Sequence, residues 1–255
     1  MSHRRTQASH SKDHGLTPPM KKFLFTLILT LTTVNSVVAQ SEPQDPHDSS
    51  RWQKTIATFE AADKKKMPPK NAILFVGSSS IRLWNLNKSF PKLVTINRGF
   101  GGSQLADSVQ FLDRIVLNYK PQSIVMYAGD NDIKAGKSPQ RVFADFAEFV
   151  AIVRKKLPAA KIHYVAIKPS ISRWKLVTLM RETNGLIKSY CDSDEQLFFV
   201  DIDQPMMGAD KKPRPELFAK DGLHLNVTGY ILWNEVLTES LLRSGCLENA
   251  KTTSK

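Results

Sequence analysis

The feature of this sequence that most constrains its fold is an alternation between short apolar runs and amphipathic stretches. Five largely apolar runs occur, at residues 72–76, 93–96, 123–127, 162–167 and 197–202. Gly77 and Gly129 close the first and third runs. Runs with so few polar positions are typical of strands that are buried on both faces of a parallel sheet.

Between these runs, apolar residues recur at helical spacing. Helices are predicted at residues 52–66, 105–116, 141–157 and 176–191, and after Asn226. We interpret the aromatic and aliphatic positions of these helices as core. Strands that alternate with helices predict one doubly wound α/β domain, with a parallel sheet covered on both faces.

The N-terminus has the pattern of a secretory signal. Lys21 and Lys22 precede an uncharged run, residues 23–39, which ends in Val37-Val38-Ala39. A basic region, an apolar region and small residues at a cleavage point predict removal near Ala39 and export to the periplasm or the medium. An uncleaved anchor is the alternative, but the strongly apolar part, residues 23–34, is short for a span of about 20 residues. Met20 is an alternative start.

The predicted organisation has four parts. Residues 1–39 form an N-terminal extension and signal peptide, residues 40–69 a linker and helix, residues 70–245 the α/β domain, and residues 246–255 a tail. Removing residues 1–39, which hold five of the 36 basic and one of the 24 acidic residues, lowers the formal charge from +12 to +8. The basic residues are dispersed and form no stripe interleaved with aromatics, so we expect no nucleic-acid partner. Two cysteines could form one disulfide or remain free thiols, and neither lies in a catalytic motif: Cys191 and Cys246.

Residues with chemical function follow the predicted strands, and in open α/β sheets sites form at the carboxyl ends of strands. Three serines, residues 78–80, follow the first strand and could supply a nucleophile or cap a helix. A glycine-rich stretch, residues 97–103, follows the second and could bring its backbone close to a ligand or form a tight turn. Asn131 follows the third and could donate to an oxyanion or form a turn.

Near the C-terminus, Asp221 precedes His224 by three residues. Such a carboxylate can fix the imidazole tautomer and stabilise the imidazolium, as a general base requires. The alternative is an Asp that caps a helix and a His that is exposed. Nucleophile, oxyanion donors, base and orienting carboxylate all fall at one predicted sheet edge, which favours a catalytic interpretation.

Together these motifs resemble the SGNH (GDSL-type) hydrolase family over roughly residues 70–243. The resemblance implies a three-layer α/β/α fold, with a five-stranded parallel sheet in the flavodoxin-like order 2-1-3-4-5. It implies a triad of Ser79, His224 and Asp221, and an oxyanion hole formed by the N–H groups of Ser79 and Gly102 and the amide of Asn131. It requires no metal or cofactor. The first motif departs from the pattern: Ser78 stands where the family has Asp.

The resulting hypothesis is an exported serine esterase that hydrolyses short acyl or acetyl esters of a small molecule or glycan through an acyl-enzyme. It would have no stable membrane insertion after signal cleavage. Rival hypotheses are an acyltransferase to a glycan hydroxyl and a non-catalytic envelope protein on a degenerate scaffold. A metal-dependent hydrolase is a third, built on Asp130, Asp132, Asp201, Asp203 and His224. Three residues after the fourth strand could line the substrate site or serve packing: Lys168, Arg173 and Trp174.

Overall fold

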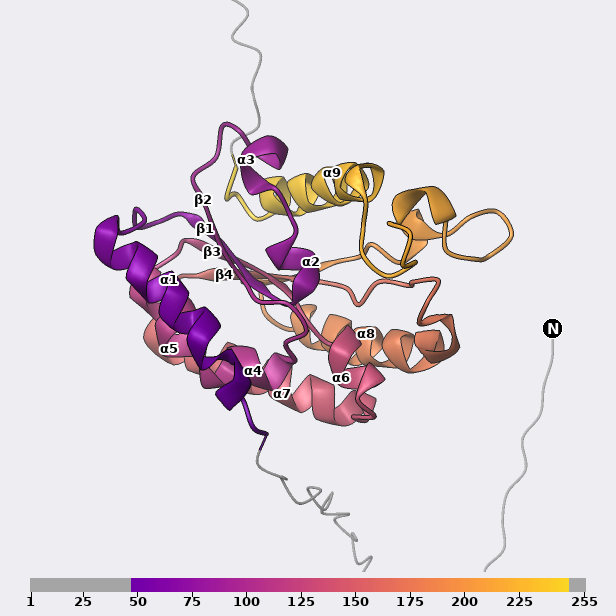
Figure 1. Ribbon diagram of the computed structural model, residues 1–255, viewed down its shortest axis with the longest axis horizontal. Helices are drawn as coiled ribbons and strands as arrows, with labels where there is room; N and C mark the ends of the chain where they lie inside the picture. The colour runs from indigo at the N-terminus through magenta and orange to yellow at the C-terminus, as the bar shows by residue number, and fades with distance from the viewer. Residues whose placement is uncertain (1–46, 248–255) are drawn as a thin grey trace, which may run out of the picture. The chain divides into compact units, whose positions relative to one another are not determined.

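The computed structural model describes residues 47–247, so the predicted signal peptide and the end of the tail lie outside the described residues. Its sheet is five-stranded, entirely parallel and ordered β2-β1-β3-β4-β5 (Figure 1). The strands are β1 (Ile73–Gly77), β2 (Thr95–Gly99), β3 (Ser123–Tyr127), β4 (Lys161–Val165) and β5 (Leu197–Val200). The predicted fold class and strand order are therefore confirmed.

Helices cover both faces of this sheet, because alternate side chains of each strand point to opposite sides. In β1, Leu74 and Val76 belong to one apolar cluster, and Ile73 and Phe75 belong to another. The first face is covered by α1 (Gln53–Lys65), α4 (Leu105–Gln110), α5 (Leu112–Ile115), α6 (Asp130–Lys134), α7 (Pro139–Lys156) and α8 (Val177–Cys191). The second face is covered by α2 (Ser79–Arg82), α3 (Leu86–Ser89) and α9 (Val227–Arg243).

Most predicted bounds lie within two residues of the observed ones, and two elements differ more. The second strand begins at Thr95 and extends through polar residues to Gly99, because Asn97 donates its amide to the carbonyls of Ile81 and Trp84 at 2.7 and 3.3 Å. The predicted helix at 105–116 is two helices, α4 and α5, which meet at Phe111. Phe111 is buried against Phe100, and its backbone leaves helical geometry there, with φ −100° and ψ 11°.

A long connection returns the chain from β5 to the sheet edge where the motifs gather. It holds two short 3₁₀ turns, η4 (Gln204–Met206) and η5 (Pro215–Leu217). Asn226 then caps α9, since its Oδ1 accepts from the N–H of Gly229 at 3.1 Å. The same amide donates to the carbonyls of Glu216 and Phe218, so the segment before α9 is fixed in place.

The two cysteines are free thiols in this structure. Cys191 is buried in the apolar cluster on the first face of the sheet, whereas Cys246 packs against the cluster on the second face. Among residues 47–247, none of the helices combines the length and the apolar character needed to cross a membrane.

Candidate active site

Ser79 is the first residue of α2, immediately after the turn that follows β1. The turn requires glycine at position 77, because φ is +133° and a Cβ there would lie 1.9 Å from the carbonyl oxygen of Tyr127. Of the three serines, Ser78 and Ser80 are buried, while Ser79 is half-buried and lines a pocket.

The structure brings Ser79, His224 and Asp221 together. Nδ1 of His224 lies 2.6 Å from Oδ2 of Asp221, and Nε2 lies 3.0 Å from Oγ of Ser79. Oδ1 of Asp221 accepts from the backbone N–H groups of Leu223 and His224, both at 2.9 Å. The hydrogen bond from His224, followed by these backbone bonds, lowers the pKa of Asp221 to about 2. Asp221 is therefore ionised at every pH near neutrality.

Asn131 and Gly102 line the pocket that Ser79 also lines. This pocket has a volume of about 480 Å³. The amide of Asn131 donates to the carbonyl of Ser103 at 2.9 Å, and its Oδ1 accepts from Nη2 of Arg173 at 3.0 Å. One amide hydrogen of Asn131 is left for a ligand. The full lining is Trp52, Thr55, Ser79, Arg82, Gly101, Gly102, Asn131, Arg173, Leu223 and His224.

Asp132 joins α6, which carries Asn131, to the start of α4, which follows the loop that contains Gly102. Its carboxylate accepts from the backbone N–H of Leu105, the first residue of α4, at 3.1 and 3.2 Å. It also accepts from Nζ of Lys137 at 3.1 Å. Burial raises the pKa of Asp132 to about 6, against the opposing effect of Lys137. This carboxylate therefore fixes the loop that holds Gly102 relative to α6.

A buried ion cluster lies beneath the pocket. Nζ of Lys168 lies 2.8 Å from the hydroxyl of Tyr127, 3.2 Å from Oδ2 of Asp130 and 3.3 Å from Oγ of Ser80. Nη1 of Arg173 also lies 3.2 Å from Oδ2 of Asp130. Burial lowers the pKa of Lys168 and opposes ionisation of Asp130, but the two cations leave the pKa of Asp130 below its ordinary value.

The three residues after β4 therefore have different positions. Lys168 is buried and contributes to packing, and Arg173 lines the pocket. Trp174 is outside that lining, and its ring is 5.0 Å from the ammonium of Lys212.

The sequence did not predict that Trp52 and Thr55, placed outside the α/β domain, would line the pocket. Trp52 packs edge-on against Phe100, with ring centroids 5.6 Å apart. Phe100 directly precedes the glycines of the pocket, so this contact holds the N-terminal segment there. Because Trp52 and Phe100 are far apart in the chain, no local sequence pattern predicts that they pack together.

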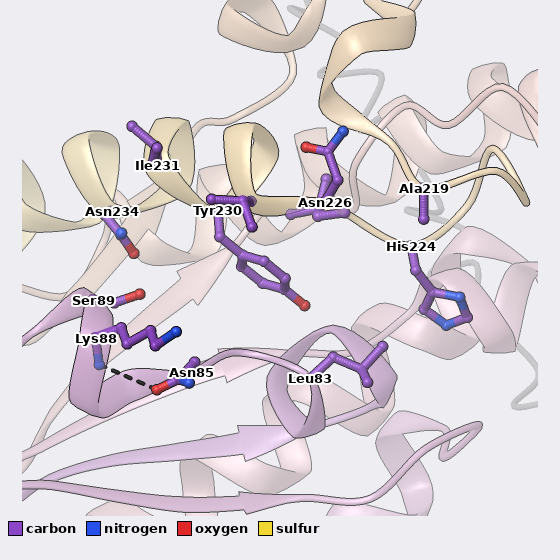
Figure 2. Close-up of a pocket in the computed structure, with 12 residues that line it drawn as sticks. Leu83, Asn85, Lys88, Ser89, Ala219, His224, Asn226, Tyr230, Ile231 and Asn234 are labelled. Atoms are coloured by element: carbon purple, nitrogen blue, oxygen red, sulfur yellow. Dashed lines mark hydrogen bonds between the residues drawn. The ribbon is translucent and has the colours of Figure 1, made fainter.

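A second pocket of about 600 Å³ lies beside His224 (Figure 2). Tyr230, Ile231 and Asn234 reach it from α9, and Leu83 reaches it from the end of α2. His224 lies at one end of this second pocket and is shared with the first.

The carboxylates of the metal hypothesis are engaged in other contacts. Asp130 pairs with Lys168 and Arg173, and Asp132 pairs with Lys137. Within residues 47–247, no three His, Cys, Asp or Glu side chains are grouped so that they could hold a metal ion.

A five-stranded parallel sheet in this order, with a serine, a histidine and polar donors gathered at its carboxyl edge, is the three-layer α/β/α arrangement of SGNH-type hydrolases. The chain belongs to the GDSL-like lipase/acylhydrolase family, whose model matches residues 82–232, and is thus an ester-hydrolysing enzyme. The match includes Asn131, Asp221 and His224 and begins three residues after Ser79.

Solved structures share this fold at low sequence identity. A protein described as a platelet activating factor from Streptococcus pneumonia has a TM-score of 0.67 and 21% identity over 75% of this chain and 94% of its own. A GDSL-like lipase from Bacteroides thetaiotaomicron has a TM-score of 0.61 and 20% identity over 77% and 98%. A catalytic mutant of an acetylxylan esterase from Geobacillus stearothermophilus has a TM-score of 0.56 and 15% identity over 68% and 95%. No curated protein matches the sequence.

Proposed function

We propose that this protein is an exported serine esterase that removes short acyl or acetyl groups from small-molecule or glycan esters. The observation that carries the proposal is the hydrogen-bonded line from Oδ2 of Asp221 through the imidazole of His224 to Oγ of Ser79, with distances of 2.6 and 3.0 Å. A carboxylate, an imidazole and a hydroxyl in this order form the arrangement that activates a serine for attack.

In the first half of the reaction, Nε2 of His224 takes the proton of Ser79 while Oγ attacks the ester carbonyl carbon. The carbonyl oxygen becomes an oxyanion, which accepts from the N–H groups of Ser79 and Gly102 and from the free amide hydrogen of Asn131. The intermediate collapses, the bond to the alcohol oxygen breaks, and the imidazolium gives its proton to that oxygen. Asp221 stabilises the imidazolium and remains ionised.

In the second half, His224 takes a proton from water, whose oxygen attacks the acyl carbon on Ser79. Collapse of this second intermediate releases the carboxylic acid and returns the proton to Ser79. The acetylxylan esterase among the structures of similar fold supports an acetylated saccharide as one substrate class.

Acyl transfer to a glycan hydroxyl is the second candidate. The second pocket supports it, because this space of about 600 Å³ opens beside His224, where an acceptor hydroxyl would lose its proton. Product analysis of an acetyl ester with added oligosaccharide tests this candidate. Acetylated oligosaccharide would indicate transfer, and free acetate alone would indicate hydrolysis.

Treatment of residues 40–255 with a fluorophosphonate, followed by peptide mapping, tests the triad. We expect one adduct, on Ser79, and its loss in His224→Ala. The exposed Ser193, on the turn after α8, offers a matched control: Ser193→Ala should label as the wild type does. Absence of any adduct on protein with native circular dichroism would instead support a non-catalytic scaffold.

Steady-state kinetics with 4-nitrophenyl acetate test the individual roles. Ser79→Ala should reduce kcat by at least about 10⁴. Asn131→Ala should reduce kcat by about 10²–10³, because one oxyanion donor is lost. A wild-type rate for Asn131→Ala would remove that residue from the oxyanion hole.

Export is tested by expressing the full chain in a bacterial host and sequencing the N-terminus of the protein recovered outside the cytoplasm. Cleavage after Ala39 would give Gln40 as the first residue. Recovery in the membrane fraction with residues 20–39 still attached would contradict cleavage and indicate an anchor.

A further inference from the structure

We propose that the pocket at Ser79 accepts esters whose alcohol part carries an anionic group, and that Arg82 binds this group. The proposal rests on the proposed function and adds a substrate class to it. It places the anion on the alcohol side because the acyl group of the proposed substrate is short and uncharged.

The position of Arg82 follows from the short helix that begins with the nucleophile. Arg82 ends α2, three residues after Ser79, and side chains at this spacing lie on the same side of a helix. The guanidinium extends over Gly101: a Cβ built at that glycine would lie 2.8 Å from Nε of Arg82 and 3.4 Å from Nη2. Absence of a side chain at position 101 thus makes room for Arg82 beside Gly102.

The charges of the pocket are uneven. Its lining includes two arginines and no aspartate or glutamate. Arg173 is already engaged, by Asp130 at 3.2 Å and by Oδ1 of Asn131 at 3.0 Å. Arg82, in contrast, is exposed and has no carboxylate within 4 Å among the described residues.

Another cation strengthens the positive potential at the same rim. Arg51 donates to the carbonyl of Gly102 at 3.3 Å and lies over the ring of Trp52, 4.7 Å from its centroid. An opening lined by charges of one sign raises the local concentration of ligands of the opposite sign.

The guanidinium of Arg82 is suited to a carboxylate or a phosphate, because its planar set of donors can bind two oxygens at once. Its position, one helical turn from Ser79, requires an anion a few bonds away from the scissile ester. A monoester of a carboxylated sugar or a carboxylated phenol has this layout. A neutral ester would leave Arg82 solvated and gain nothing from it.

Three aryl acetates that differ only in the para substituent test the proposal: 4-acetoxybenzoate, 4-acetoxyphenyl phosphate and the neutral 4-acetoxybenzamide. The measured quantity is kcat/KM for each anionic ester divided by kcat/KM for the neutral amide ester. Comparing this ratio between two variants cancels the differences in intrinsic reactivity among the three esters. Arg82→Gln should lower the ratio about tenfold for at least one anion, as expected for loss of a charge-assisted hydrogen bond. The two anionic arms show whether a carboxylate or a phosphate is preferred.

The matched control is Lys155→Gln, which removes one exposed positive charge at the far end of α7. It should leave the ratio as in the wild type. Arg82→Lys keeps the charge without the planar donors and should give an intermediate ratio. In 0.5 M salt, screening should reduce the difference between wild type and Arg82→Gln.

Failure of this proposal and failure of the proposed function give different results. If wild type and Arg82→Gln hydrolyse all three esters with the same ratio, the anion site is overturned and the esterase stands. If the wild type hydrolyses none of them, the esterase is overturned, and the anion site is then tested by calorimetry with the alcohol products. Tighter binding of 4-hydroxybenzoate than of 4-hydroxybenzamide, lost in Arg82→Gln, would support Arg82, and equal binding would overturn it.

Discussion

Asn131 is held at both ends of its carboxamide. Oδ1 accepts from Arg173, and one hydrogen on Nδ2 goes to the carbonyl of Ser103. This pairing leaves one orientation for the amide, with its second hydrogen in the pocket. If the group were rotated by 180°, Oδ1 would face the Ser103 carbonyl, and the nitrogen would face a cation. We therefore infer that Arg173 is a positioning residue, which fixes the amide of Asn131 for its proposed role as an oxyanion donor.

Arg173→Lys tests this inference. We expect kcat for 4-nitrophenyl acetate to fall about tenfold with KM nearly unchanged, because the amide would lose its fixed orientation without losing a substrate contact. In an Asn131→Ala background the same change should have little further effect, since residues that act as a unit are not additive. The control is Arg181→Lys, because Arg181 on α8 is exposed and pairs with Asp203 after β5. An equal loss in both backgrounds would show that Arg173 acts independently of Asn131.

At the residue scale, the sequence predicted which side chains lie together at the candidate site. It did not predict the surrounding contacts that fix their positions. Asp221 and His224 are three residues apart, so their contact is local and could be inferred from spacing. Lys168 lies far along the chain from the partners that bury it, Tyr127 and Asp130, and its burial depends on packing that no local pattern records.

At the scale of elements, α4 and α6 are joined by the buried carboxylate of Asp132, which accepts from the N–H of Leu105. Its pKa is raised to about 6 by burial, above the ordinary value of 3.8. Between these values the folded protein binds more protons than the unfolded chain. The contribution of Asp132 to the free energy of unfolding therefore decreases as pH rises through this window.

Asp132→Asn keeps the shape of the side chain and removes its titration. We expect the free energy of unfolding of the wild type, relative to this variant, to fall by about 1–3 kcal/mol between pH 3.5 and pH 6.5. Urea denaturation at several pH values measures the difference, and groups common to both proteins cancel. A difference that is constant with pH would contradict the raised pKa.

The cluster beneath the pocket links the segment after β4 to α6 through Lys168 and Asp130. Lys168→Met should lower the free energy of unfolding by about 3–5 kcal/mol, because removing one partner leaves other buried charged and polar groups without theirs. Lys188→Met, which removes an exposed partner of Asp192 on α8, is the control and should change it by less than about 1 kcal/mol. Guanidinium denaturation measures both. If both variants lowered the free energy of unfolding by a similar amount, burial of the Lys168–Asp130 pair would not make it more important for stability than the exposed Lys188–Asp192 pair.

The bounds of elements were predicted less well than their order. The helix expected at 105–116 is interrupted at Phe111, whose burial against Phe100 requires a change of backbone direction. The second strand includes Asn97 because other segments satisfy that amide. In both cases a tertiary contact overrides the local pattern.

At the scale of the whole molecule, alternation of strands and helices was sufficient to predict the class of fold. The strand order came from the family resemblance, because periodicity does not record which strands are neighbours. The sheet also separates two cores, and this separation decides what the cysteines do. Cys191 and Cys246 pack against clusters on opposite faces.

We therefore expect no disulfide in the folded protein. Burial raises the pKa of Cys191 to about 12, so its thiol should not react with Ellman's reagent in the folded state. The half-buried Cys246 should react, and both should react after unfolding in denaturant without a reductant. Dithiothreitol should leave the Tm unchanged. If no thiol reacts in the unfolded, unreduced protein, the two cysteines are bonded.

The contact of Trp52 with Gly102 and Phe100 places the segment that leads into α1 beside the pocket at Ser79, at the carboxyl edge of the sheet. The last helix ends at the other edge, where the carbonyl of Ser244 accepts from Lys161, the first residue of β4. Under the proposed function, a bulky fusion or a solid support held close to Trp52 would therefore stand at the opening through which a substrate enters. Attachment through the C-terminal side would orient the opening toward solution, which makes that side the better choice for immobilising the enzyme.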